Sequence, residues 1–187
     1  HFFDPIIVLF LGGFTISAAF TKYKVDKFIS INLINLVGNK APIVLLSLFV
    51  LSAFLSMWMS NTASAALLLP ISLTILKESG VNTKSPLYKA FPLAIAYSAT
   101  TGGLATLIGS PPNALAVKYL SEYSVNPIDL SFSEWMFLML PVVIVMLAII
   151  YVVILIKFKV SGKKLEIKLK NVKLDNKGKI TLVVTIL

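Results

Sequence analysis

Long apolar stretches, separated by short segments that carry lysine, make up most of the chain. They cover residues 2–20, 41–76, 90–117 and 132–156. The first and the last of them have about the 20 apolar residues that a membrane-spanning helix needs. Only 13% of all residues are charged and the mean hydropathy is +0.90, whereas soluble domains carry about 25% charged residues. The pattern therefore predicts an integral membrane protein built from helices.

The order of these segments predicts an all-α membrane fold. Residues 25–39 mix apolar residues with Asp26, Lys27 and three asparagines, which favours an interfacial helix over a span. We expect a transmembrane helix at 1–24, an interfacial helix at 25–40, a helical hairpin at 41–77, a discontinuous transmembrane helix at 85–120, a transmembrane helix at 132–157, a lysine-rich segment at 158–179 and the start of a further helix at 180–187. The chain begins without methionine and stops inside an apolar run, so we expect an internal piece of a longer membrane protein.

Lysine placement gives the chain an orientation. Lysines lie at one set of segment ends and acidic residues at the other: Lys22, Lys24, Lys27, Lys40, Lys77, Lys84 and Lys89 against Asp4, Glu122, Asp129 and Glu134. The positive-inside rule then places the lysine-rich segment in the cytoplasm, where membrane lipid is its expected partner. Nucleic acid is not an expected partner, because the chain contains no arginine. Trp135, near the outer end of a span, is expected to anchor the interface.

The stretch 41–76 is too long for a single span. A continuous helix of this length would extend roughly 54 Å, against a hydrocarbon core of about 30 Å. A polar cluster lies in its middle, at Ser56, Ser60, Asn61, Thr62 and Ser64. The chain can return there either through two full spans with a tight outer turn or through a re-entrant helical hairpin whose tip stops inside the membrane. We favour the hairpin, because residues 63–76 would extend only roughly 21 Å and the turn has neither charge nor glycine.

The third apolar stretch contains its own break, in the sequence TTGGLATLIGSPPNALA. The paired glycines weaken a helix, and Pro111 and Pro112 cannot donate to its hydrogen bonds. Ser110 precedes a proline, so it leaves the helical region and can cap a new helix with Pro111 near its first position. Irregular backbone at membrane depth is tolerated only where it is buried or lines an aqueous cavity. Two such breaks are typical of a transport site built from discontinuous helices.

Both breaks supply groups that an anion and a cation need. We expect new helices from Ala63 and from Asn113, whose unpaired N–H groups and macrodipoles together form a cradle for a small anion. The helices that end at the breaks leave free carbonyls, which with serine and asparagine oxygens suit a hard cation such as Na+. Hydroxyls can also serve merely to pack helices closely. That is the role we expect for Ser47, Ser52, Ser72 and Ser98, away from the breaks.

The segments MSNTASAALLLPI and GGLATLIGSPPNALA, in this order and spacing, resemble the divalent anion:sodium symporters, the INDY-like di- and tricarboxylate and sulfate carriers. DPIIVLFLGGF near the start fits as well, so the resemblance covers nearly the whole chain, as the first of two inverted repeats. It implies that sodium is bound by the Ser-Asn-Thr tip, a serine one turn earlier and the glycine before the S-P-P-N segment: Ser56, Ser60, Asn61 and Gly109. It implies that the substrate carboxylate or sulfate contacts Asn61, Thr62, Ser110 and Pro111.

The resemblance also implies partners that this chain lacks. No second Ser-Asn-Thr motif occurs, since Asn82 and Thr83 lie in a lysine-flanked loop. The second repeat, with the second sodium site, is therefore expected in another part of the same protein. We further expect a homodimer in the plasma (inner) membrane.

The expected function is sodium-coupled secondary transport of a small divalent anion by alternating access. The substrate would be a di- or tricarboxylate such as succinate, malate or citrate, or sulfate, and Na+ the coupling ion. A sodium-independent anion exchanger on the same scaffold stays open, and so does a non-transporting membrane fragment. An enzyme is not expected, because the eight carboxylates lie in loops or at segment ends and the chain has no cysteine and no histidine beyond His1.

Overall fold

The computed structural model describes residues 39–123 and 129–160 continuously, together with scattered positions between 11 and 32, residues 164–165 and residues 175–186. The described residues form the helices α3 (Ala41–Ser56), α4 (Asn61–Glu78), α5 (Leu87–Gly102), α6 (Pro111–Glu122), α7 (Phe132–Phe158) and α8 (Asn176–Ile186). No strand occurs among them, so the expected all-α fold is confirmed for this part of the chain. Most of the expected helices at 1–24 and 25–40 and of the lysine-rich segment at 158–179 lie outside the described residues.

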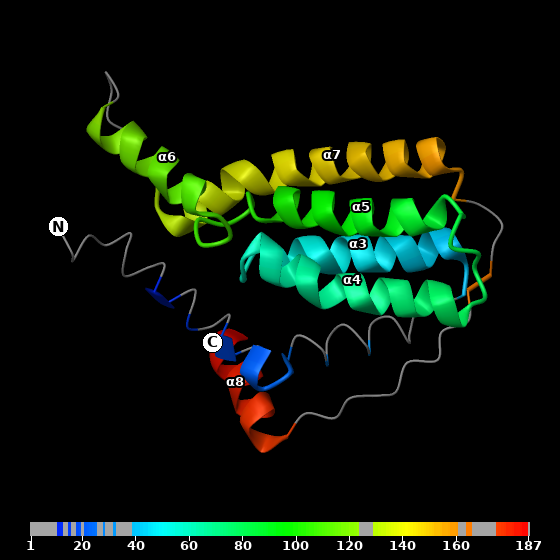
Figure 1. Cartoon of the computed structure of the whole chain (residues 1–187). Coiled ribbons are helices and arrows are strands. Elements are labelled where there is room, and N and C mark those ends of the chain that lie inside the picture. The colour runs from blue at the N-terminus through cyan, green and yellow to red at the C-terminus, as the bar shows by residue number, and fades with distance from the viewer. Residues whose placement is uncertain are drawn as a thin grey trace.

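Four helices lie alongside one another (Figure 1). The central helix is α5, which contacts α3, α4 and α7. The helices α3 and α4 run in opposite directions and are joined by residues 57–60. At the end of α5 the chain passes through residues 103–110 into α6, which points away from the other helices (Figure 1).

Local signals set where several of these helices begin and end. Pro42 stands in the first turn of α3, where its missing N–H costs nothing. A capping box starts α7: the N–H of Glu134 donates to Ser131 Oγ at 3.3 Å, and the N–H of Ser131 donates to Glu134 Oε2 at 2.8 Å. Just beyond α4, Gly80 adopts a φ of +63°, which a residue without a side chain reaches freely.

Large apolar side chains fill the space between the four helices. Among the fully buried ones are Leu45, Leu48 and Phe49 of α3, Leu68 and Ile75 of α4, and Phe91 and Ile95 of α5. The ring of Tyr151 on α7 packs against Phe49 with 5.6 Å between the ring centroids, and its hydroxyl donates to the Pro42 carbonyl at 2.8 Å. The hydrophobic surface of α3 is thus covered from two sides.

Four of the buried serines of these helices behave as packing residues. Each donates its hydroxyl hydrogen to a backbone carbonyl: Ser47 to Val44, Ser52 to Ile95, Ser72 to Leu69 and Ser98 to Ile95. Of the four, Ser52 alone reaches another helix, at 2.9 Å across the contact of α3 with α5. Near that contact a side chain on Gly102 would overlap the backbone of Ala53. Small residues therefore let α3 and α5 approach closely.

The helix α7 differs from the others in its exposure. Within the described residues it is the one helix that is long and apolar enough to cross a membrane, and only 11% of its most apolar window is buried. Its exposed side chains include Phe137, Ile144, Val152 and Ile156. A helix that is apolar on all sides and so little covered is typical of a segment surrounded by lipid.

Candidate functional site

The tip of the hairpin brings one helix end and one helix start together. Ser56 is the last residue of α3 and Asn61 the first residue of α4. The Ser56 hydroxyl donates to Asn61 Oδ1 at 2.5 Å. Ser60 occupies the N-cap position, where its Oγ accepts the N–H of Ala63 at 3.2 Å. The helix therefore starts two residues before the expected Ala63, because Ser60 supplies the cap.

Two glycines pack the loop of residues 103–110 against this tip. A side chain on Gly103 would overlap Oδ1 of Asn61. A Cβ atom on Gly109 would lie 2.6 Å from the carbonyl oxygen of Gly103 and 2.9 Å from that of Ser56. Real Cβ atoms do not approach oxygens so closely, so only glycine permits both contacts. The two glycines thus place the loop directly beside the Ser56–Asn61 pair.

Buried polar side chains that sequence reasoning missed hold the loop in place. Thr106 Oγ1 donates to the Met57 carbonyl at 2.5 Å and accepts the N–H of Gly109 at 3.0 Å. Asn113 Nδ2 donates to the carbonyls of Gly103 at 2.8 Å and Thr106 at 2.7 Å. The hint in the sequence is that both residues lie within or beside the glycine- and proline-containing break, where backbone groups lose their helical partners.

Trp135 also holds this loop. Its indole Nε1 donates to the Leu104 carbonyl at 3.0 Å, and only 9% of its surface is exposed. The expectation that Trp135 anchors the membrane interface is therefore wrong. The polar end of the ring has a backbone partner inside the protein and does not need the aqueous boundary.

The helix α6 begins at Pro111, as expected for a proline near the first position, and two residues before Asn113. Ser110 takes the expected N-cap position, but its side chain makes no cap hydrogen bond. The reason is that the next two residues are prolines, which have no N–H to offer. The first N–H available, that of Asn113, donates to the Ser110 carbonyl at 3.1 Å. An anion at this break would therefore find most of its backbone donors at the start of α4.

The residues expected to bind sodium and substrate fall into two groups. Ser56 and Gly109 are buried beside the partly buried Asn61, whereas Ser60 is exposed next to it. Of the expected substrate contacts, Thr62 and Pro111 are exposed and Ser110 is half-buried. No charged residue occurs in the stretches 41–76 and 90–117, which contain all of these positions. The cluster is thus uncharged, buried at Ser56 and Gly109 and open at Ser60, Thr62 and Pro111.

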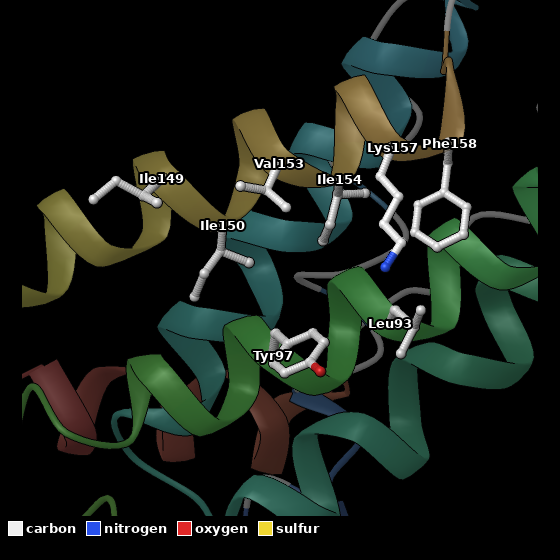
Figure 2. Close-up of a pocket in the computed structure, with 8 residues that line it drawn as sticks. All are labelled: Leu93, Tyr97, Ile149, Ile150, Val153, Ile154, Lys157 and Phe158. Atoms are coloured by element: carbon white, nitrogen blue, oxygen red, sulfur yellow. The ribbon is translucent and has the colours of Figure 1, made fainter.

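A cavity of about 250 Å³ lies away from this cluster, between α5 and α7 (Figure 2). Its lining residues are Leu93, Tyr97, Ile149, Ile150, Val153, Ile154, Lys157 and Phe158. The Tyr97 hydroxyl and the Lys157 ammonium are its polar groups, and every other lining side chain is apolar. None of the residues expected to bind sodium or substrate lines it. A divalent anion, which needs several convergent donors, fits the hairpin tip better than this groove.

Discontinuous helices that meet at such a cluster are typical of secondary transporters. A profile of the citrate transporter family (CitMHS) matches residues 1–187, so the chain belongs to this family. An uncharacterized transporter of Haemophilus influenzae is 40% identical over 158 residues, which are 84% of this chain and 32% of that protein. The sodium-dependent dicarboxylate transporter SdcS of Staphylococcus aureus is 38% identical over 155 residues, 78% of this chain and 29% of SdcS. Its namesake in Staphylococcus saprophyticus is 37% identical over 172 residues, 87% of this chain and 33% of that protein.

These relatives confirm the resemblance to sodium-coupled anion carriers. Membership in a transporter family makes the protein an integral membrane protein, and both family and relatives point away from an enzyme. The chain spans about a third of the length of the relatives it matches.

Proposed function

We propose that the full protein is a sodium-coupled secondary transporter of a small di- or tricarboxylate, such as succinate, malate or citrate, and that this chain supplies half of its binding site. The observation that carries the proposal is the contact of Ser56 with Asn61 and Gly109, where a helix end, a helix start and a loop meet. The relatives named as sodium-dependent dicarboxylate transporters support both the coupling ion and the substrate class.

The proposed sodium ligands are neutral oxygens at this meeting point. They are the side chains of Ser56, Ser60 and Asn61 and the backbone of Gly109. In the structure the Ser56 hydroxyl points its hydrogen at Asn61 Oδ1. A hydroxyl can rotate, so both oxygens can instead turn a lone pair toward one cation. Oxygen ligands are the type that hard cations prefer.

The proposed anion site is the start of α4 with the exposed groups around it. The first N–H groups of a helix have no partner within the helix, and Ser60 uses its side chain for the N–H of Ala63. Asn61 and Thr62 are the residues at the first two helical positions, and Ser110 and Pro111 lie at the other break. Because no cationic side chain is present in either stretch, the positive charge has to come from the helix end and from bound sodium.

The size of these contributions makes sodium necessary. A helix terminus contributes at most about 2 kcal/mol to binding a charge in a partly buried site. The desolvation penalty of even one buried ion is several kcal/mol. A sodium ion at Ser56 and Asn61 would add a full positive charge beside the anion. Anion and sodium should therefore each raise the affinity of the other.

The hairpin geometry supports a tip inside the membrane. At 1.5 Å per residue, the 16 residues of α3 and the 18 residues of α4 extend about 24 and 27 Å, less than the roughly 30 Å of a hydrocarbon core. Lysines flank both outer ends, at Lys40 and Lys77. We place these ends and the segment 158–179 in the cytoplasm. The remaining part of the protein would supply an inverted repeat with the second half of the site, and two copies would form a homodimer that works by alternating access.

The test is a calorimetric titration of the purified full-length protein with succinate, citrate and sulfate, once in sodium chloride and once in choline chloride. We expect the preferred carboxylate to bind at least about tenfold more tightly in sodium, within the usual range of coupling energies. Sulfate serves as the control for the substrate class, and tighter binding of sulfate would reassign that class. Equal affinity in both salts would reject the sodium role, and an exchanger on the same scaffold would take its place.

A further inference from the structure

Thr106 is the side chain that connects the loop 103–110 to the tip of the hairpin by hydrogen bonds. It is fully buried and lies 49 residues from its partner Met57 along the chain. Its single oxygen acts in both directions, donating to the Met57 carbonyl and accepting the N–H of Gly109. The Thr106 hydroxyl thus links Met57, which follows Ser56, with the N–H of Gly109, the proposed backbone ligand.

This link fixes the direction of the Gly109 backbone. Its N–H is held by Thr106, while a Cβ atom added to it would overlap the carbonyl oxygens of Gly103 and Ser56. The residue is thus bonded on one side and in close contact on another. The Gly109 backbone is therefore held beside Ser56 and the Ser56–Asn61 pair.

Asn113 braces the same loop from the other side. Its amide donates to the carbonyls of Gly103 and Thr106, and only 3% of its surface is exposed. Both hydrogen bonds act on the backbone of the loop, whereas that of Thr106 crosses to the hairpin. Of these two residues, only Thr106 makes the position of Gly109 depend on the position of α3.

We propose that Thr106 is a positioning residue of the cation site. Its hydroxyl sets the spacing between the Gly109 backbone and the Ser56–Asn61 pair. This spacing determines the affinity for sodium and the preference for sodium over lithium. The inference rests on the proposed sodium site. Thr106 itself is not one of the proposed ligands, because its hydroxyl serves the Met57 carbonyl and the N–H of Gly109. Its effect is to assemble ligands that come from two separate breaks of the chain.

The test uses full-length protein in liposomes with Thr106→Val, Thr106→Ser and Ser98→Ala. Valine keeps the shape and removes the hydroxyl, whereas serine keeps the hydroxyl and removes a methyl group. Ser98 is the matched control, a fully buried hydroxyl that bonds only to Ile95 of its own helix. For each variant the sodium and lithium concentrations that give half-maximal succinate uptake are measured, with the maximal rate and the midpoint of thermal unfolding in choline.

We expect Thr106→Val to raise the half-maximal sodium concentration about tenfold and to reduce the preference for sodium over lithium, since two buried backbone groups lose their partner. Thr106→Ser should stay within about threefold of the wild type, as should Ser98→Ala.

Should the valine variant fail to insert, Thr106→Cys replaces it, because a thiol is a weak donor of similar size. The cysteine variant should raise the half-maximal sodium concentration at least about threefold. An unchanged sodium requirement in the valine or cysteine variant overturns the inference, and so does a serine variant as impaired as valine. Sodium-independent uptake by the wild type would instead reject the proposed sodium site itself, and the inference with it.

Discussion

The hydroxyl of Ser56, at the end of α3, donates a hydrogen bond of 2.5 Å to the side-chain oxygen of Asn61, at the start of α4. This bond joins the two arms of the hairpin at its tip. Both oxygens lie where helix-terminal backbone groups lack intrahelical partners, and neither carries a charge. A cation that binds here would compete only with one neutral hydrogen bond, which the rotation of a hydroxyl can give up at little cost.

Replacing Asn61 by alanine should abolish sodium-dependent uptake and leave membrane insertion intact. The amide oxygen is the acceptor of the Ser56 hydroxyl and a proposed sodium ligand, and its removal leaves Ser56 without this partner. Asn82→Ala is the matched control, because Asn82 lies in an exposed loop where its side chain accepts the N–H of Lys84. Uptake of labelled succinate into liposomes and gel filtration in detergent measure the two properties. Uptake with wild-type kinetics in the Asn61 variant would show that the residue is not part of the site.

The sequence predicts the two breaks because their causes are local. An uncharged stretch of 36 residues cannot remain a single spanning helix, and the Gly-Gly and Pro-Pro pairs disrupt the helical hydrogen bonds in the next one. The structure has α3 end at Ser56 and α5 at Gly102, beside these signals. The start of α4 lies two residues before the predicted Ala63, since the pattern alone does not show which residue of a polar run acts as the cap.

The contacts that hold the loop could not be predicted in this way. Thr106 bonds to a residue 49 positions away and Trp135 to one 31 positions away. Such pairs depend on how α3, α5 and α7 pack in three dimensions, and no periodicity in the sequence records that packing. In an uninterrupted helix Thr106 would bond to a carbonyl of its own preceding turn, as Thr100 does with Ala96 at 3.1 Å.

Replacing Trp135 by phenylalanine should lower stability through the loop. Phenylalanine keeps most of the apolar contact and removes the N–H that serves the Leu104 carbonyl, a loss of about 1 kcal/mol for a net hydrogen bond. Trp58→Phe is the control, because Trp58 is partly exposed and lies at the hairpin turn. The midpoint of thermal unfolding in detergent should fall further for Trp135→Phe than for Trp58→Phe. Equal midpoints would mean that the indole hydrogen bond contributes nothing measurable.

The orientation of the chain can be tested with single cysteines, since this part of the protein contains none. Cysteines at positions 84 and 161 should react with an impermeant thiol reagent only from the cytoplasmic side, and a cysteine at position 129 only from outside. The reason is the separation of lysines from acidic residues along the apolar segments. The background is a full-length protein made free of other cysteines, with inside-out and right-side-out vesicles compared. Labelling of positions 84 and 129 from the same face would overturn the proposed topology.

Neighbouring glycines should separate damage to the site from damage to the fold. A methyl group on Gly103 would meet Oδ1 of Asn61, a side-chain atom that can rotate away. Gly103→Ala should therefore fold normally and raise the half-maximal sodium concentration, because Asn61 leaves Ser56.

A methyl group on Gly102 would meet the backbone of Ala53, which cannot move without separating α3 from α5. Gly102→Ala should therefore cost about 1–3 kcal/mol of stability, even though alanine favours a helix more than glycine does. Gly12→Ala, with no atom of the described residues within 4 Å of the added methyl group, should change neither property. Sodium titrations of uptake and thermal unfolding of all three variants measure the difference. The same loss of stability in Gly102→Ala and Gly103→Ala, with no separate effect on sodium, would contradict the placement of Asn61 in the cation site.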